Sequence, residues 1–239
     1  MTDKIDVLPC IGGEPGFVRL VDHMGSDLSI VRSARVSYNA DWRSDIEEGE
    51  TLPKDVKLIN YLMKNKHTSP FESVVFTFEV KAPIFVFRQW HRHRTWSYNE
   101  MSARYTQLDE GFYLPKQEDI TTQSKDNKQM RTVEVHPAAE SLQEAMNDSC
   151  ERSLDDYKWL LEQGCPRELA RGVLPVFTYS RMFAVVDLHN LLHFLILRLH
   201  QHAQLEVRVY AQAMLQLVEP IVPVTIAAFK QTHLSELTK

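Results

Sequence analysis

Hydrophobic and polar positions along the chain predict three strands and several helices. The strand candidates either alternate in polarity or are dense in β-branched and aromatic residues, and they cover residues 17–24, 74–82 and 178–187. Apolar residues at helical spacing predict helices over 27–37, 55–64, 83–94, 137–163, 166–174, 187–218 and 225–232. In the helix at 187–218, one face carries Leu188, Leu191, Leu195 and Leu199.

Three other stretches lack this periodicity. Residues 41–53 are acidic and polar and predict a loop, while residues 102–115 have an extended pattern. Residues 117–136 are polar and predict a mobile insertion in which little chemistry is expected. No repeat and no linker divides the sequence. We therefore expect a single α+β domain over residues 1–239, with a mixed, largely antiparallel sheet flanked by long helices.

Composition narrows the class of protein. The chain has 239 residues, of which 44% are hydrophobic and 25% charged, as in ordinary globular proteins. A formal net charge of -5 supplies no bulk positive field, so neither nucleic acid nor a membrane is an expected partner. Histidines and an arginine interrupt the most apolar stretch, residues 188–204, which argues against a membrane span. Cys10, Cys150 and Cys165 lack CxxC spacing and the N-terminus lacks a signal-peptide pattern, which favours the cytoplasm.

Candidate chemistry concentrates between residues 88 and 105. Glu100 is the one acid in this stretch, which holds four arginines: Arg88, Arg92, Arg94 and Arg104. A guanidinium is planar, always charged and able to bind two phosphate oxygens at once, so the cluster predicts one or more phosphates as its partner. Interleaved Ser97, Asn99 and Ser102 are the small donors and acceptors that fix the edge of a nucleobase or flavin.

Two other interpretations compete for the same cluster. An arginine-rich helix end can be a solvated or salt-bridged surface, but here aromatic residues take the place of acids and lysines, as in a cleft wall: Trp90, Trp96, Tyr98 and Tyr105. Arginines interleaved with aromatics also suit nucleic acid, against which the lack of a wider basic surface argues. No GxGxxG or P-loop string occurs, so side-chain arginines would hold any phosphate.

The string RHRTWSYNEMSARY, residues 92–105, closely resembles the signature of the flavin-dependent thymidylate synthases. The resemblance continues upstream through HTSPFESVVFTFEVKAPIFVFRQW and downstream through ARGVLP and LRLHQHAQLEVR, so it covers most of the chain after about residue 60. It implies reductive methylation of dUMP to dTMP. The carbon donor would be 5,10-methylenetetrahydrofolate, and the hydride would come from FAD reduced by NADPH.

The resemblance also implies which residues bind the substrate. Two subunits of a homo-oligomer, expected to be a homotetramer, would share each dUMP site. One subunit would supply Gln89, Trp90, His91 and Arg92, and another Glu100, Met101, Ser102, Ala103 and Arg104. Arg171 would also contact the nucleotide. Arg198 would be the catalytic residue, because a fixed cation beside N3 and O4 stabilises the electron-rich uracil ring whose C5 must become nucleophilic. His202, one helical turn further along, would support it.

Implied FAD contacts are Ser69, Arg92, His93, Arg94, Glu100, Asp187, Leu188, His189 and His193, with His67 lining the flavin pocket. The family more often has Asn and Arg where this chain has Asp187 and His189, and Asp187 is equally suited to cap the helix that follows it.

Two other enzyme classes remain as alternatives. A cysteine-dependent synthase would need a thiolate near the arginines, for which only Cys165, close to Arg167 and Arg171, is a candidate. A metal enzyme could use the pairs His91/His93 or His189/His193, but neither pair has a further acid or cysteine to complete a ligand set, so no metal is expected. A non-enzymatic binding or scaffold role is the last alternative.

Overall fold

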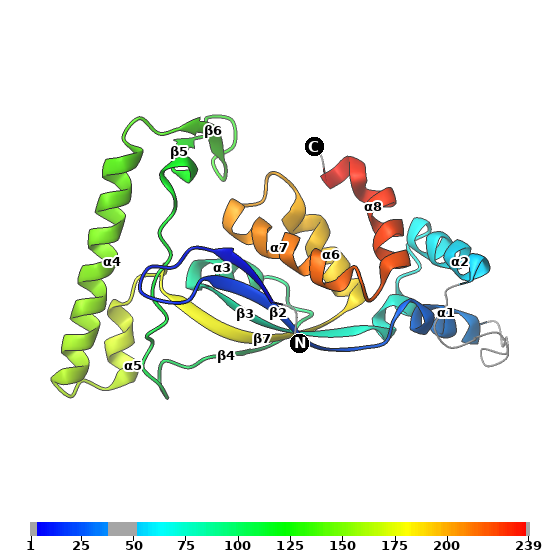
Figure 1. Cartoon of the computed structure of the whole chain (residues 1–239), viewed down its shortest axis with the longest axis horizontal. Coiled ribbons are helices and arrows are strands. Elements are labelled where there is room, and N and C mark those ends of the chain that lie inside the picture. The colour runs from blue at the N-terminus through cyan, green and yellow to red at the C-terminus, as the bar shows by residue number, and fades with distance from the viewer. Residues whose placement is uncertain (1–3, 38–51, 238–239) are drawn as a thin grey trace.

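A five-stranded sheet in the order β1-β2-β3-β7-β4 forms the centre of the molecule (Figure 1). The computed structural model describes residues 4–37 and 52–237. The three expected strands are confirmed as the central ones, β2 (Gly16–Met24), β3 (Val75–Pro83) and β7 (Tyr179–Asp187). The edge strands β1 (Lys4–Leu8) and β4 (Ser97–Glu100) are short, and the sequence pattern did not predict them. Every neighbouring pair is antiparallel, which confirms an α+β fold around a largely antiparallel sheet.

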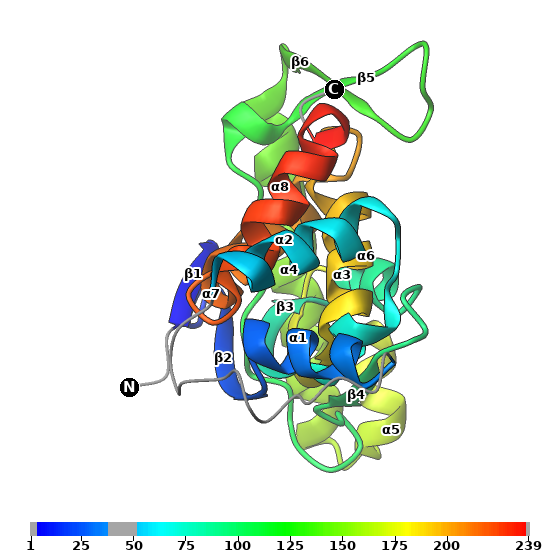
Figure 2. The ribbon, with the colours of Figure 1, turned by 90° about the vertical axis from the view of Figure 1, so that its right-hand side faces the viewer.

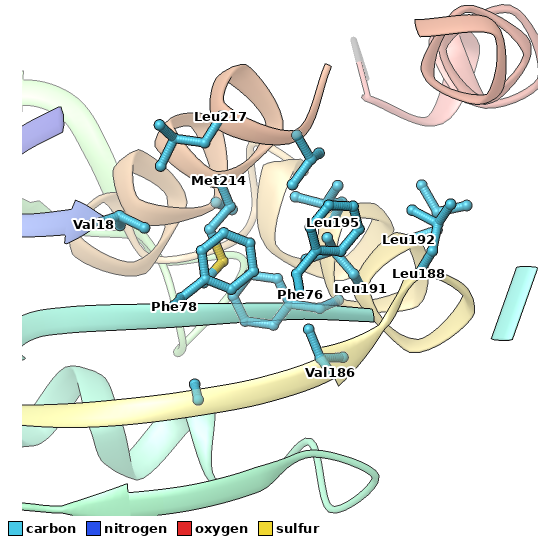
Figure 3. Packing of buried hydrophobic residues seen from close by; sticks show 14 of the residues in the cluster. Val18, Phe76, Phe78, Val186, Leu188, Leu191, Leu192, Leu195, Met214 and Leu217 are labelled. Atoms are coloured by element: carbon cyan, nitrogen blue, oxygen red, sulfur yellow. The ribbon is translucent and has the colours of Figure 1, made fainter. Parts of the chain in front are cut away.

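Alternation along the strands places the core on one face of the sheet. Phe76, Phe78 and Val80 of β3 are fully buried, whereas the exposed fractions of Phe183 and Val185 on β7 are 46% and 37%. Helices α6 (Leu188–Leu199) and α7 (Leu205–Val218) cover the buried face (Figure 1). Their leucines and Met214 pack directly on the two phenylalanines (Figure 3). The opposite face of β7 is left partly uncovered within one chain.

Two groups of elements extend the sheet at its ends. At one end lie α1 (Asp27–Val36), α2 (Pro53–Lys64), the 3₁₀ turn η1 (Ser69–Ser73) and α8 (Pro223–Leu237), which Figure 2 shows stacked together. At the other end stands α4 (Ala139–Glu162), followed by α5 (Arg167–Ala170) and the turn η3 (Arg171–Val173). The helix α3 (Ile84–Trp90) follows β3 directly.

Two helix predictions are corrected by the structure. The expected helix 187–218 is two helices, because the backbone of His200 turns extended and its Nδ1 accepts the amide of His202 at 3.1 Å, an alternative to the next helical bond. Folding back lets both halves bury their apolar faces on the sheet, where one straight helix of about 48 Å would overrun it. The helix predicted over 83–94 ends at Trp90. Residues 91–96 form turns that lead the chain back to the sheet, where Ser97–Glu100 pair with β7 as β4. The C-terminal helix is longer than the predicted 225–232.

The predicted loops have mixed outcomes. Residues 102–115 are extended, and Phe112 bridges Ile11 and Thr178. The segment 117–136 contains a turn, η2 (Gln117–Asp119), and a two-stranded sheet of β5 (Thr121–Gln123) and β6 (Arg131–Val135), which the pattern did not predict. Its mobility stays a prediction. Of the loop predicted at 41–53, all but the last two residues lie outside the described residues.

Candidate functional site

Trp90 anchors the arginine cluster to the core. Its indole is fully buried, stacks on Phe194 with centroids 5.0 Å apart and meets Trp96 and Tyr210 edge-on at 6.0 Å. The amide of His93 donates to the Trp90 carbonyl at 2.9 Å, which closes a turn immediately after α3. The short segment from His91 to Arg94 is thereby fixed between a packed helix end and a strand of the sheet.

Three arginines at the end of α3 and in the segment after it point to solvent. Arg88, Arg92 and Arg94 are exposed, and none makes a hydrogen bond or an ion pair with the part of the chain that the structure describes. Arg181 makes a useful contrast, because Glu110, Glu14 and Glu79 all pair with it. The salt-bridged interpretation is therefore wrong for the three exposed arginines. Their free donors fit a phosphate monoester or a pyrophosphate.

Arg198 lies beside this cluster and is half-buried. Its Nε donates to Nε2 of His93 at 3.0 Å, and its NH2 group donates to the carbonyl of Gln89 at 3.3 Å. Burial lowers the pKa of the guanidinium. The pKa of His93 is lowered to about 4, first by burial and then by the charges of Arg198 and His193. The structure thus brings the predicted residues Gln89, His93, His193 and Arg198 together.

The aromatic residues complete one wall of the site. The Tyr98 hydroxyl donates to the carbonyls of His93 at 2.8 Å and Trp90 at 3.2 Å, and burial raises its pKa. His91 meets the Tyr98 ring at 4.8 Å, and its buried Nε2 finds no hydrogen-bond partner among the described residues. A buried ring nitrogen without a partner fits a site that a bound molecule completes.

Several of the predicted FAD residues lie on or beside the first half of α6. Leu188 is buried and its amide donates to Val74 at 2.8 Å, and η1 packs against α6, which brings exposed Ser69 to the same region. His193 reaches His93, with ring centroids 6.4 Å apart. His189 is half-buried on the first turn of the helix. Exposed His67 precedes η1 and meets the Tyr61 ring edge-on at 5.7 Å.

The N-cap interpretation of Asp187 is confirmed. Its Oδ1 accepts the amide of Asn190 at 2.9 Å and its Oδ2 accepts the Asn190 side-chain amide at 2.6 Å. Both oxygens are therefore used within the helix start. A contact from this carboxylate to FAD stays a prediction.

The second predicted half of the dUMP site lies at the end of β4 and on η3. Glu100 is paired with Met182 of β7, and the Met101 amide donates to the Arg181 carbonyl at 2.8 Å. Arg104 Nε lies 3.8 Å from a Glu168 carboxylate oxygen, and Arg171 Nε donates to the Glu168 carbonyl at 3.4 Å. Ser102 accepts the Arg104 amide through its hydroxyl at 3.3 Å, and Ala103 is buried beside it.

The two predicted halves of the dUMP site are not linked directly. No hydrogen bond or ion pair among the described residues joins the group around Gln89, His93 and Arg198 to the group around Arg104 and Arg171. A cavity of about 260 Å³ opens beside Glu100, between Asn99 and Phe183. We call these two groups half-sites, and their sharing between subunits stays a prediction.

Sequence reasoning missed one residue of the first half-site. Gln204, which begins α7, accepts a hydrogen bond from the Gln89 side-chain amide at 2.5 Å and ties the α6–α7 turn to the end of α3. The segment containing it was singled out only for its resemblance. Because the sequence pattern predicted an unbroken helix there, it gave no signal that Gln204 would face α3. His202, expected to support Arg198, is exposed and packs on the His200 ring at 4.6 Å.

The structure also shows where the cysteines and the histidines of the alternative enzyme classes lie. The Cys165 thiol is half-buried and donates weakly to the neighbouring Pro166 carbonyl at 3.8 Å. Cys150 is buried in α4, and Cys10 lies beside the Glu110 carbonyl at 3.2 Å. Within the described ranges, no three His, Cys, Asp or Glu side chains are grouped to hold a metal ion. Across 4–37 and 52–237, no helix is both long and apolar enough to pass through a bilayer.

Comparison with known proteins assigns the class. The family model described as thymidylate synthase complementing protein matches residues 19–224, and the chain belongs to this family. A flavin-dependent thymidylate synthase of Treponema denticola is 48% identical over 222 residues, which are 91% of this chain and 80% of that protein. One of the same name from Thermus thermophilus is 48% identical over 223 residues, 93% of this chain and 78% of that protein.

A solved structure is similar as well. The UMP/dUMP methylase PolB from Streptomyces cacaoi, bound with 5-Br dUMP, has a TM-score of 0.82 and 36% sequence identity. The match covers 92% of this chain and 96% of the methylase.

Proposed function

We propose that this protein is a flavin-dependent thymidylate synthase that converts dUMP to dTMP. Its carbon donor is 5,10-methylenetetrahydrofolate, and NADPH is the reductant. The observation that carries the proposal is the half-buried Arg198, held at the edge of a group of exposed arginines without counter-charges. Family membership supports the same reaction.

The arginines hold the phosphates. A nucleotide monophosphate brings about -1.5 to -2 of charge, and Arg92 from one half-site with Arg104 and Arg171 from the other offer three guanidinium groups to it. Arg104 forms a weak, exposed ion pair with the Glu168 carboxylate, and Arg171 donates to the Glu168 backbone carbonyl, so the phosphate would replace one weak contact of each arginine. Glu100, Met101, Ser102 and Ala103 line the nucleotide beside Arg104.

The residues present also fit FAD. Exposed Arg92 and Arg94 suit its pyrophosphate, while Ser69, Leu188, His189 and His193 border it from η1 and α6. When bound and reduced, FAD supplies the hydride that completes the methyl group. His93, between Arg92 and Arg94, and Glu100, at the end of β4, would also contact it, and Asp187 orders the start of α6.

Arg198 activates the uracil ring by electrostatics. The cation is fixed by the protein before substrate arrives, so it stabilises negative charge developing on N3 and O4 without reorganising. Its half-buried position strengthens that effect, since charges interact more strongly away from bulk water. Gln89 and His91 place the pyrimidine against this cation, while the fully buried Trp90 holds the end of α3 in place behind them.

We further propose that each site is completed by a second copy of the chain in a homotetramer. The lack of any hydrogen bond or ion pair between the two half-sites among the described residues supports this. Phe183 and Val185, exposed on the open face of β7, support it too, because they form an apolar surface suited to contact with another subunit. The three cysteines are free thiols, which fits the reducing cytoplasm as the place of the reaction.

Subunit complementation tests the shared site. Arg198→Ala and Arg104→Ala each damage one half-site, so at dUMP concentrations well below the KM of Arg104→Ala each parent should form little dTMP. If the halves come from different subunits, mixed oligomers contain some sites with both halves intact and should form dTMP. Mixed oligomers as inactive as the parents would show that both arginines serve the same subunit's site.

The reaction itself is tested with purified protein, dUMP, 5,10-methylenetetrahydrofolate, NADPH and FAD, with dTMP quantified by mass. Omitting any one of the four should abolish the product. UMP is assayed in parallel, because the similar methylase of Streptomyces cacaoi is described as acting on both nucleotides. If only UMP gave a methylated product, UMP would replace dUMP as the proposed substrate.

A further inference from the structure

Two acceptors fix the direction of the Arg198 side chain. Nε of Arg198 donates to Nε2 of His93 at 3.0 Å, and the NH2 group donates to the Gln89 carbonyl at 3.3 Å. A guanidinium carries five N–H donors, so most remain free for a ligand. Gln89 contributes only its backbone, which leaves the imidazole of His93 as the one side chain among these acceptors.

We propose that His93 is a positioning residue, a neutral hydrogen-bond acceptor that holds the Arg198 guanidinium in the orientation required for uracil activation. The inference rests on the proposed function and adds a specific role for His93 to it. His93 would act through Arg198. This role is additional to any contact that His93 and its neighbours make with FAD.

The surroundings of His93 are built to hold its ring still. The side chain is 7% exposed, its backbone amide donates to Trp90 and its carbonyl accepts the Tyr98 hydroxyl at 2.8 Å. The edge of the ring meets Phe194 with centroids 4.9 Å apart. An acceptor held by packing and hydrogen bonds on all sides can orient a flexible arginine, because the arginine loses its freedom to a partner that does not move.

Electrostatics keep this acceptor available at neutral pH. The charged or titratable groups facing the imidazole are Arg198 and His193, both on α6, and the Tyr98 hydroxyl from β4 donates to the His93 carbonyl. Burial and these neighbours lower the pKa of His93 to about 4. The proton of the neutral ring therefore lies on Nδ1 and the Nε2 lone pair faces Arg198. A protonated ring could not accept this bond and would repel the guanidinium.

Substitutions separate the acceptor from the shape of the side chain. His93→Leu removes the acceptor, whereas His93→Gln can place a carbonyl oxygen near the position of Nε2. His136→Leu is the matched control, because His136 lies next to the β6 strand and its Nδ1 accepts only the local Ala138 amide. The double variant His93→Leu/Arg198→Ala tests whether the effect passes through Arg198.

We expect His93→Leu to lower kcat by about 10- to 100-fold at saturating FAD, the rate equivalent of a hydrogen bond to a charged group. His93→Gln should recover most of that loss, and His136→Leu should match the wild type. In the Arg198→Ala background His93→Leu should have little further effect. The proposal would be overturned if His93→Leu kept full activity or if His93→Gln did not recover the lost kcat. It would also be overturned if the losses of His93→Leu and Arg198→Ala were additive in the double variant, or if excess FAD abolished the loss in His93→Leu.

An arm without turnover keeps this test independent of the proposed reaction. In ¹⁵N NMR of histidine-labelled protein at neutral pH, His93 should be neutral with Nε2 unprotonated, and its pKa should rise in Arg198→Ala because the neighbouring cation is gone. If the wild type made no dTMP but gave these spectra, the proposed reaction would be wrong, while the hydrogen bond between Arg198 and His93 would still stand. Spectra with Nε2 protonated, or a pKa unmoved by Arg198→Ala, would overturn the positioning role.

Discussion

Asp27 caps a helix that is remote from it in sequence. Its carboxylate is 2% exposed and accepts the amides of Val224 at 2.9 Å and Thr225 at 3.0 Å, and the Thr225 hydroxyl at 2.6 Å. These amides belong to the first turn of α8, whose N–H groups have no partner inside the helix. Asp27 itself begins α1, so this one side chain fastens the two helices together.

Replacing Asp27 by Ala should destabilise the protein by about 2–4 kcal/mol. A hydrogen bond to a charged group contributes about 1.5–3 kcal/mol and loss of a helix cap costs about 0.5–2 kcal/mol, but the three bonds share one carboxylate and its desolvation offsets part of the gain. For a chain of this length the change corresponds to a fall in Tm of roughly 4–16 °C. Asp27→Asn keeps one acceptor and should lose about half as much.

The assay is thermal unfolding followed by circular dichroism, with Asp155→Ala, exposed on α4, as the control. Burial raises the pKa of Asp27 above its usual 3.8. The folded protein therefore binds this proton more readily than the unfolded chain, and the stability due to Asp27 falls as pH rises through the window just above 3.8. The difference between wild type and Asp27→Ala should shrink as pH rises through the range just above 3.8. A Tm of Asp27→Ala equal to that of the control, or a difference that grows with pH, would refute this reasoning.

Three further predictions concern the site and its supports. Trp90→Ala should cost about 3–5 kcal/mol and weaken FAD binding, as measured by denaturant titration and flavin fluorescence, whereas Trp159→Ala, which is 57% exposed, should do neither. Arg104→Ala should raise the KM for dUMP by about 10- to 100-fold with little effect on the melting temperature. Its control, Arg152→Ala on α4, should leave both quantities unchanged. An unaltered KM in Arg104→Ala would show that Arg104 does not bind the phosphate. Arg131→Ala breaks the 3.1 Å pair with buried Glu206, so limited proteolysis should cut the β5–β6 hairpin faster than in the wild type, and equal rates would contradict that role.

The sequence allowed the central strands to be predicted because their patterns are dense and nearly unbroken. β3 and β7 pair over nine residues, and both carry the β-branched and aromatic residues that a half-buried sheet favours. The edge strands β1 and β4 have five and four residues, too few positions to show a period. The break between α6 and α7 has no glycine or proline to mark it, so only tertiary packing reveals it.

The candidate site was located by local composition, but its geometry was not. Arginines without nearby acids indicated an anion site, and the structure confirms that Arg88, Arg92 and Arg94 lack counter-charges among the described residues. The bond between Arg198 and His93 joins residues 105 positions apart, and the sequence carries no sign of it. Gln204 was missed for the same reason, because its contact depends on how the start of α7 meets the end of α3. Tyr98 was predicted as part of the cleft wall, but its bond to the His93 carbonyl was not.

Anaerobic oxidation of the reduced flavin tests the central claim most directly. The protein with FADH2 is mixed with dUMP and 5,10-methylenetetrahydrofolate together, flavin absorbance is followed and dTMP is quantified at the end. We predict that dTMP forms in step with flavin oxidation in the wild type, and that Arg198→Ala retains FAD but forms dTMP far more slowly. Flavin oxidation without dTMP in the wild type, or undiminished dTMP formation in Arg198→Ala, would contradict the account.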